Sequence, residues 1–327
     1  LATSVFRGCL DWRGSNPSLA GMGRRLRFIP PGGALVEVTC RTLQGRFLLT
    51  PRPDLNEIVV GVLARAKRRY PLDVCAVVFL SNHFHLLLFV EDVQQLARFM
   101  TYVGSNVARE VARLTGWRDK VWGRRYQAIV VSDEEAAQVS RLEYLLAHGC
   151  KEGLVRRLRD WPGVHCVRAL CSGDSLEGIW FDRTRQNRAK RRGKLAPPSD
   201  FAHSESLTLD PLPCWRHLSE EEHCARAVEI VARIEAPAGV DAPPELRRAR
   251  RPRHPFNRPR RLDRSPAPSF HAFSRAVRAK LDQAYAFFFA AFRQAAERLR
   301  LGDRTAKFPP GAFPSRLQFE RPTLALI

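Results

Sequence analysis

Residues 74–90 read VCAVVFLSNHFHLLLFV, and this stretch decides the fold. Apolar runs rich in Val, Leu and Phe lie on both sides of a polar break at Ser81-Asn82, a pattern that predicts two buried strands joined by a turn. Because alternate residues of a strand share a face, His83 and His85 should point the same way, with Phe84 on the other side. Such a pair can serve as metal ligands, although two half-buried histidines at a sheet edge would give the same pattern.

The composition favours a polyanionic partner. The 327 residues include 54 Lys+Arg against 33 Asp+Glu, a formal net charge of +21, and nucleic acid is the first candidate. The apolar share of 45% is enough for a sizeable core. The eight cysteines include no Cys-x-x-Cys pair, which argues against a disulfide scaffold or a zinc ribbon. With no apolar run of membrane-spanning length and no evident secretory signal, we expect a cytoplasmic protein with reduced thiols and no membrane partner.

Apolar periodicity around residues 74–90 predicts an α+β core. The order strand, helix, strand, strand, helix, strand, helix is typical of an antiparallel sheet with helices packed on one face. The other predicted strands cover residues 34–42 and 121–131, and the predicted helices cover residues 54–69, 91–115 and 133–149.

The sequence divides into a flexible leader, a core and two C-terminal parts. These are residues 1–25, residues 26–170, a basic Arg/Pro-rich linker region at 171–268, and a helix with its tail at 269–327. The linker region should be partly disordered, with a short helix at 220–234. Its basic runs, residues 183–194 and 247–264, are expected to bind phosphate without sequence preference, with solvated tails as the alternative. The apolar stripe of residues 269–300, which includes Phe273 and Phe288, should pack on the core, with a dimer contact as the minor alternative.

One helix carries a second pair of reactive side chains. Tyr144 and His148 are four residues apart in the helix predicted over 133–149, so they lie on the same face. If this helix packs on the histidine strand, His83, His85 and His148 would surround a divalent metal, with Tyr144 beside it. A metal neutralises charge on a phosphate and favours the phenolate of a nearby tyrosine, which could attack phosphorus and keep the ester as a phosphotyrosine.

Three ordered motifs resemble those of single-tyrosine HUH transposases, in particular the REP-associated tyrosine transposases, which are similar to insertion sequence 200-like enzymes. The motifs are SNHFHLLLF, VWGRRYQAIVVSDEE and RLEYLLAHGCKEGLV, and the resemblance covers roughly residues 26–170. It implies a ferredoxin-like core, His83, His85 and His148 as ligands of Mg²⁺ or Mn²⁺, and Tyr144 as the catalytic nucleophile. It also implies cleavage of single-stranded DNA near a hairpin, a 5′-phosphotyrosine link, a bacterial nucleoid-associated location, and a monomer or homodimer.

The chain departs from the family at the third ligand. The position four after the tyrosine is commonly Asn or Gln, and here it is His148. A third nitrogen ligand is softer than an amide oxygen and favours Mn²⁺ or Zn²⁺ over Mg²⁺.

Several residues near residue 124 are candidates for DNA binding. Arg124 and Arg125 could grip phosphate or could lie on a solvated strand edge. Tyr126 and Trp122 could stack on bases or simply pack, and Tyr126 is a less favoured alternative nucleophile. Cys214, His217, His223 and Cys224 have zinc-ligand side chains in an acidic, helix-like stretch, and a zinc site there is the minor alternative.

Three functions remain open from the sequence. The first is a transposase-like endonuclease, in which Tyr144 nicks single-stranded hairpin DNA and transfers the strand. The second is a domesticated relative that binds such DNA without cutting it. The third is a metal-dependent phosphodiesterase in which water attacks. A covalent protein–DNA adduct would separate the first from the other two.

Overall fold

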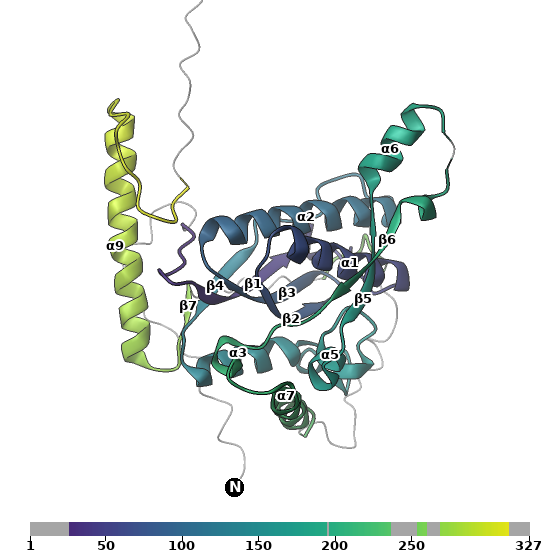
Figure 1. The fold of residues 1–327 in the computed structure, drawn as a ribbon, viewed down its shortest axis with the longest axis horizontal. Helices are drawn as coiled ribbons and strands as arrows, with labels where there is room; N and C mark the ends of the chain where they lie inside the picture. The colour runs from purple at the N-terminus through teal and green to yellow at the C-terminus, as the bar shows by residue number, and fades with distance from the viewer. Residues whose placement is uncertain (1–25, 195, 237–253, 260–268, 314–327) are drawn as a thin grey trace, which may run out of the picture.

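The computed structural model describes residues 26–194, 196–236, 254–259 and 269–313, so the expected leader at 1–25 lies outside the described residues (Figure 1). A five-stranded sheet has the order β2-β3-β1-β4-β7, and a separate two-stranded ribbon pairs β5 with β6. The strands are β1 Ala34–Arg41, β2 Asp73–Phe79, β3 His83–Val90, β4 Gln127–Val131, β5 Leu176–Phe181, β6 Ala202–Leu207 and β7 Phe270–His271. The helices are α1 Pro53–Arg69, α2 Val93–Thr115, α3 Glu135–Leu146, α4 His148–Lys151, α5 Val167–Ser172, α6 Arg183–Arg191, α7 Glu220–Glu235 and α9 Arg275–Arg300. Short 3₁₀ turns lie at Leu43–Gly45, Leu158–Asp160, Pro198–Phe201 and Pro213–Trp215.

The hairpin predicted from residues 74–90 is confirmed and forms one side of the sheet. Strand β3 pairs antiparallel with both β2 and β1, and β1 pairs antiparallel with β4. Strands β1 and β3 are therefore central, which explains why they read as nearly continuous apolar runs. In this register Thr39 lies opposite His85.

Helices cover both faces of the sheet, which confirms the α+β class and adds a layer to the expected single helical face (Figure 1). Phe84 on β3 contacts the Trp122 ring at 5.4 Å between centroids, and the Trp122 indole N–H donates to the Gly104 carbonyl of α2 at 2.8 Å. Phe84 thus points towards the layer of α1 and α2. Because neighbouring residues of a strand alternate, His83 and His85 point to the opposite layer, which contains α3.

Helix α2 ends where the sequence predicts and begins two residues later, at Val93. The Asp92 side chain accepts a hydrogen bond from the Gln95 backbone N–H at 2.7 Å, and Gly116 ends the helix with φ of 71°. A residue with positive φ is strained unless it is glycine, so Gly116 fits this end.

Part of the expected linker region has regular structure. Strands β5 and β6 form a ribbon on α1, and α6 connects them at the far end (Figure 1). At the crossing, a Cβ added to Gly61 would overlap the backbone of Ile179, and one added to Gly178 would overlap the backbone of Gly61. Only glycine lets the two backbones approach this closely. The helix predicted over 220–234 is confirmed as α7, whereas most of residues 247–264 lies outside the described residues.

The C-terminal helix starts later than predicted. Residues Phe270–His271 form β7, parallel to β4, and α9 begins at Arg275. Phe288 of α9 joins the core as predicted, and Tyr285, which the predicted stripe did not include, joins it too. Phe273, expected on the stripe, is 76% exposed. Among the described residues, no helix is long and apolar enough to span a membrane.

Candidate metal and tyrosine site

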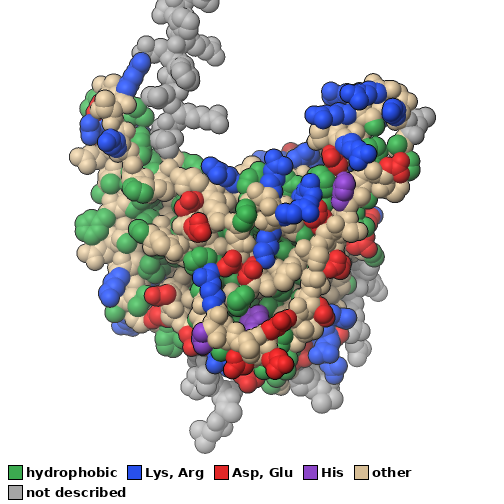
Figure 2. Space-filling view, in the orientation of Figure 1, with side chains coloured by type: hydrophobic (Ala, Val, Ile, Leu, Met, Phe, Trp, Pro, Cys, Tyr) green, Lys and Arg blue, Asp and Glu red, His purple; other side chains and the backbone are tan. Residues whose placement is uncertain are grey.

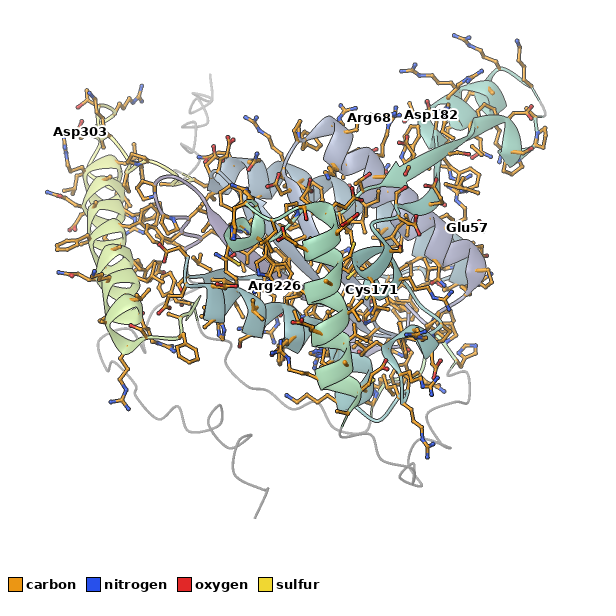
Figure 3. All side chains as sticks on the ribbon, turned by 60° about the horizontal axis from the view of Figure 1, so that its bottom comes forward. Glu57, Arg68, Cys171, Asp182, Arg226 and Asp303 are labelled. Atoms are coloured by element: carbon orange, nitrogen blue, oxygen red, sulfur yellow. The ribbon has the colours of Figure 1, made fainter. Side chains whose placement is uncertain are left out.

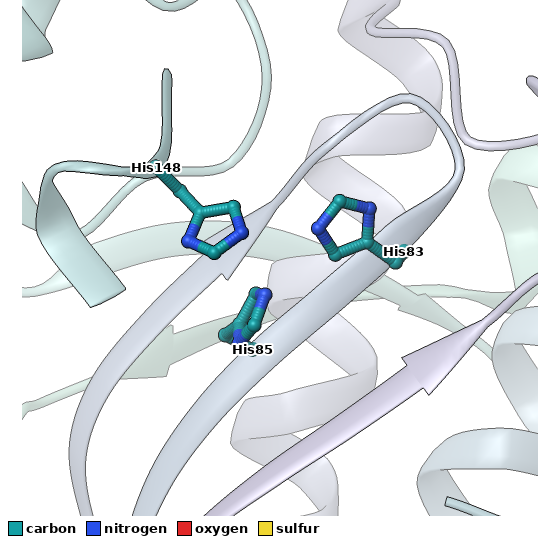
Figure 4. Close-up of side chains that lie close together, drawn as sticks. All are labelled: His83, His85 and His148. Atoms are coloured by element: carbon teal, nitrogen blue, oxygen red, sulfur yellow. The ribbon is translucent and has the colours of Figure 1, made fainter. Parts of the chain in front are cut away.

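Three histidines from two parts of the fold meet beside the sheet. His83 and His85 share a face of β3, with their ring centroids 5.1 Å apart. The His148 ring lies 4.2 Å from that of His85 and 5.3 Å from that of His83 (Figure 4). One nitrogen from each residue lies within 4.8 Å of the other two. Within the described part of the chain, this is the one such cluster of three or more metal-ligand side chains.

A break in the tyrosine helix places His148. Helix α3 ends at Leu146 and a new short helix, α4, begins at His148, so the continuous helix predicted to residue 149 is wrong. Gly149 does not cap the helix but lies buried inside α4. The His148 Nδ1 remains 3.4 Å from the Tyr144 carbonyl oxygen. Its Nε2 lies 3.8 Å from a carboxylate oxygen of Glu152, which is too far for a hydrogen bond, so Nε2 is the nitrogen available for a metal.

The cluster is buried, and burial keeps the imidazoles of His83 and His148 neutral. The exposed fractions are 5% for His83, 4% for His85 and 7% for His148. Burial, reinforced by the neighbouring histidines, lowers the pKa of His83 well below its usual value and lowers the pKa of His148 to about 3. A neutral imidazole offers a lone pair, which is the form that binds a metal.

His85 has the orientation that a metal ligand requires. Its Nδ1 lies 2.7 Å from a carboxylate oxygen of Glu37, so Nδ1 carries the proton and Nε2 carries the lone pair. That Nε2 is fully buried and has no hydrogen-bond partner. A buried acceptor without a partner costs free energy, and a cation among the three histidines would satisfy it. The residues present therefore fit a divalent metal.

Glu37 and Arg141 support the cluster and were not predicted from the sequence. Glu37, on β1, is 2% exposed, and its second carboxylate oxygen lies 3.1 Å from the Arg141 Nε of α3. Burial alone would raise the pKa of Glu37, but the hydrogen bond with His85 and the charge of Arg141 lower it below its usual value. The sequence signal was a single carboxylate inside the apolar strand ALVEVTC, together with an arginine three residues before Tyr144.

Tyr144 lies at the open side of the cluster. Its ring centroid is 5.1 Å from that of His148 and 6.2 Å from that of His85, and the residue is 38% exposed. The Arg141 guanidinium lies 4.9 Å and the Lys151 ammonium 5.2 Å from the ring centroid. Burial and the charge of Glu37 raise the pKa of Tyr144, and Arg141 opposes that rise. Without a metal the phenol is therefore protonated at neutral pH.

The predicted DNA-binding residues are divided between packing and exposure. Trp122 and Tyr126 are partly buried; the Tyr126 hydroxyl has no partner, burial raises the pKa of Tyr126 to about 12, and Arg27 lies 4.3 Å from its ring centroid. These two aromatic side chains pack rather than form an open stacking surface. Arg124 and Arg125 are exposed, in the loop before β4.

The alternative zinc ligands do not converge. Cys214 lies in the 3₁₀ turn before α7 and His223 and Cys224 lie within α7, but these residues form no ligand cluster among the described side chains. The His223 ring instead contacts that of Trp215 at 5.4 Å.

Comparisons with known proteins find structural neighbours only. No family model matches the sequence, and no curated protein matches it. A REP-associated tyrosine transposase solved bound to a REP hairpin is 19% identical, with a TM-score of 0.37, and the match covers 46% of this chain and 87% of that one. A candidate transposase from Deinococcus radiodurans is 16% identical, with a TM-score of 0.27, covering 37% of this chain and 95% of that one. Both neighbours are named as transposases. TM-scores this low do not establish a shared function, so the function of this chain is inferred from the geometry of its site.

Proposed function

We propose that the chain is a metal-dependent, transposase-like enzyme that nicks and transfers single-stranded, hairpin-bearing DNA through Tyr144. The observation that carries the proposal is the convergence of three buried histidines beside a half-exposed tyrosine. A protein that needed these histidines only for packing would satisfy their nitrogens internally, and the His85 Nε2 is not satisfied. The REP hairpin bound by one structural neighbour is consistent with the proposed substrate.

His83, His85 and His148 would hold the metal. When bound there, a divalent cation neutralises charge on a phosphate oxygen and lowers the pKa of a nearby phenol. The three nitrogen donors favour Mn²⁺ over Mg²⁺, which prefers oxygen ligands. Glu37 fixes the His85 proton on Nδ1, so that the Nε2 lone pair faces the other two imidazoles.

Tyr144 would be the nucleophile. Its oxygen forms a bond to phosphorus as the bond from phosphorus to the 3′ oxygen breaks, which leaves a 5′-phosphotyrosine and a free 3′-hydroxyl. The phenol proton passes to water, and the departing 3′ oxygen takes up a proton. Arg141 and Lys151 lie near the ring and would stabilise the negative charge that gathers at the phosphate and the phenol oxygen.

The test is a covalent adduct on a denaturing gel. Labelled single-stranded hairpin DNA from the region flanking the gene would be mixed with protein and Mn²⁺, Mg²⁺ or EDTA. We expect an SDS-resistant adduct with metal, strongest with Mn²⁺, and none in Tyr144→Phe. The matched control is Tyr126→Phe, because the Tyr126 hydroxyl is buried without a partner and its removal should leave the adduct intact.

The other outcomes assign the other functions. Cleavage without an adduct would mean that water attacks and that the protein is a phosphodiesterase. Binding to hairpin DNA without cleavage in any metal would mean a DNA-binding protein that no longer cuts. Both results would contradict the role proposed for Tyr144.

A further inference from the structure

Helix α6 is strongly basic, and most of its charges have no partner. Residues 183–194 contain seven Lys and Arg and no Asp or Glu. No residue of α6 is fully buried. Within the part of the chain that the structure describes, no ion pair neutralises the five exposed cations Arg188, Lys190, Arg191, Arg192 and Lys194. We refer to residues 182–194 as the basic arm.

The basic arm is fixed at its first turn. The Asp182 side chain caps α6 by accepting a hydrogen bond from the Arg185 backbone N–H at 2.8 Å (Figure 3). Arg183 forms two hydrogen bonds, of 2.7 and 2.6 Å, with the carboxylate of Glu110 on α2. Both side chains are largely buried, with exposed fractions of 14% and 7%. A paired, bidentate contact of this kind sets the direction in which the helix points.

The ribbon that carries the basic arm is also held tightly to the body. The Arg65 guanidinium of α1 lies 4.3 Å from the centroid of the Trp180 ring and 3.0 Å from the buried carboxylate of Glu205 on β6. The close crossing of Gly61 and Gly178 fixes the same ribbon on α1. The exposed cations therefore project from a ribbon that packs firmly on α1.

The basic arm lies away from the histidine site. Figure 1 shows α6 extending beyond the layer of α1 and α2, whereas the histidines face the layer of α3. In the space-filling view, blue side chains gather at this projection (Figure 2). Nucleic acid held there would be a different segment from the strand that reaches Tyr144.

The chemistry of the basic arm fits a rigid polyanion. Arg188 is three residues from Arg191 and four from Arg192, and like charges at these spacings repel one another and destabilise a helix. A bound polyanion would relieve that repulsion. Residues 183–194 include no aromatic side chain, which is the usual platform for single-stranded bases. Duplex DNA needs no such platform, because its charge is dense and its backbone is regular.

We infer that the basic arm binds the phosphate backbone of double-stranded DNA that flanks the single strand at the histidine site. The inference rests on the proposed function only in taking DNA as the polyanion. Duplex binding by the basic arm requires neither the metal nor Tyr144. The contact is independent of sequence and strongly dependent on salt.

The test compares two variants that remove the same charge. The arm variant is Arg188→Gln/Lys190→Gln/Arg191→Gln/Arg192→Gln. The control variant is Arg293→Gln/Arg300→Gln/Arg304→Gln/Lys307→Gln, which neutralises four exposed cations on and after α9. Fluorescence anisotropy with a blunt 30-base-pair duplex in EDTA, between about 50 and 200 mM salt, gives affinity and salt slope. The arm variant should bind on the order of 100-fold more weakly at low salt, with a slope shallower by about 3–4.

Three results would overturn the inference. One is an arm variant that keeps the wild-type affinity and slope. A second is a control variant that loses as much, since net charge rather than position would then explain the binding. The third is an equal loss towards single-stranded DNA of the same length. Adduct formation on a short hairpin is measured separately and tests the proposed function. A failure of duplex binding by the basic arm can therefore be distinguished from a failure of nicking through Tyr144.

Discussion

The histidine site and the basic arm are both suited to bind charge, but in opposite physical ways. The site gathers three imidazoles at 4–7% exposure, each held in a fixed direction by the surrounding fold. The basic arm keeps five cations in solvent, without ion-pair partners in the described part of the chain. Directional ligands need burial and support from neighbouring residues, whereas exposed charges act together and require only a defined position.

This difference predicts how each region fails. Loss of one buried histidine removes a metal–ligand bond and weakens metal binding by the remaining histidines. Substitutions at the site should therefore lower metal affinity strongly, and their effects should not add. Loss of one exposed cation removes one phosphate contact, so effects at the basic arm should be small and additive. The predictions below run from the largest expected effect to the smallest.

The substitution His85→Ala should give the largest effect. It removes the imidazole whose buried Nε2 has no other partner, so the affinity for Mn²⁺ should fall by more than about 100-fold and the adduct should vanish. Titration calorimetry with Mn²⁺ on the folded variant measures this. His165→Gln is the control, because His165 is also buried but both its ring nitrogens have backbone partners. Wild-type Mn²⁺ affinity in His85→Ala would contradict the assignment of the metal site.

Glu37→Gln tests the support beneath the site. The variant should lose metal affinity by about 10–100-fold, because the His85 proton and ring orientation are no longer fixed by a carboxylate. It should also lose stability by about 3–5 kcal/mol, because Arg141 remains buried without its counter-charge. Urea unfolding and Mn²⁺ titration measure the two effects separately.

A second variant separates the structural role of Glu37 from its positioning role. Glu37→Gln/Arg141→Met removes both charges of the buried pair and should recover much of the lost stability. It should not recover metal affinity if the carboxylate orients His85. Recovery of both together would mean that Glu37 matters only for the fold.

The sequence predicted the parts of the site that depend on local pattern. The apolar runs on both sides of Ser81-Asn82 were sufficient for the β2–β3 hairpin, because short runs rich in Val, Leu and Phe beside a turn signal indicate strands buried on both faces, in which alternate residues share a face. The same spacing placed His83 and His85 on one face. Helical spacing placed Tyr144 near His148, although the break at Ala147 that aims His148 leaves no mark in the apolar pattern.

The rest depends on contacts between residues distant in the sequence. The burial of a carboxylate at Glu37 is explained only by its partners Arg141 and His85, which lie on α3 and β3. Strands β5 and β6 are half-exposed, and a short half-exposed ribbon gives a weak apolar signal. The position of Phe270 in the sequence fits both the apolar stripe of a helix and a strand. It lies in a strand because it pairs with Val130 of β4.

Acid should destabilise the protein through His165, a buried histidine outside the three-histidine cluster. His165 accepts from the Val167 N–H through Nδ1, and its Nε2 donates to the Leu146 carbonyl, so a proton added at Nδ1 would replace a hydrogen bond with repulsion. Burial lowers the pKa of His165 to about 4. Its stabilising effect is complete above the unfolded-state pKa of about 6.5 and is lost as pH falls towards 4, because the unfolded chain then binds more protons. About 2 kcal/mol from His165 alone should disappear between pH 7 and pH 5.

His165→Gln should reduce this dependence on pH. Glutamine can donate and accept in similar directions but does not titrate, so unfolding free energies measured in urea at pH 7 and pH 5 should differ by less than in wild type. The exposed His217→Gln is the control and should keep the wild-type difference. Unchanged pH dependence in His165→Gln would mean that other groups account for acid sensitivity. Because His165 is not a ligand, Mn²⁺ should still raise the melting temperature of His165→Gln.

The smallest effect is expected for a single charge of the basic arm. Arg188→Gln should make the salt slope for duplex binding shallower by about 0.9 and should leave the fold, metal affinity and adduct formation unchanged. Adding Arg192→Gln should add a second, equal decrement, since exposed cations contact separate phosphates. A loss concentrated in one residue would indicate instead a specific contact, such as a guanidinium that reads a base edge. Equal decreases in the salt slope would show that the basic arm acts through its total charge, whereas the histidine site depends on each individual ligand.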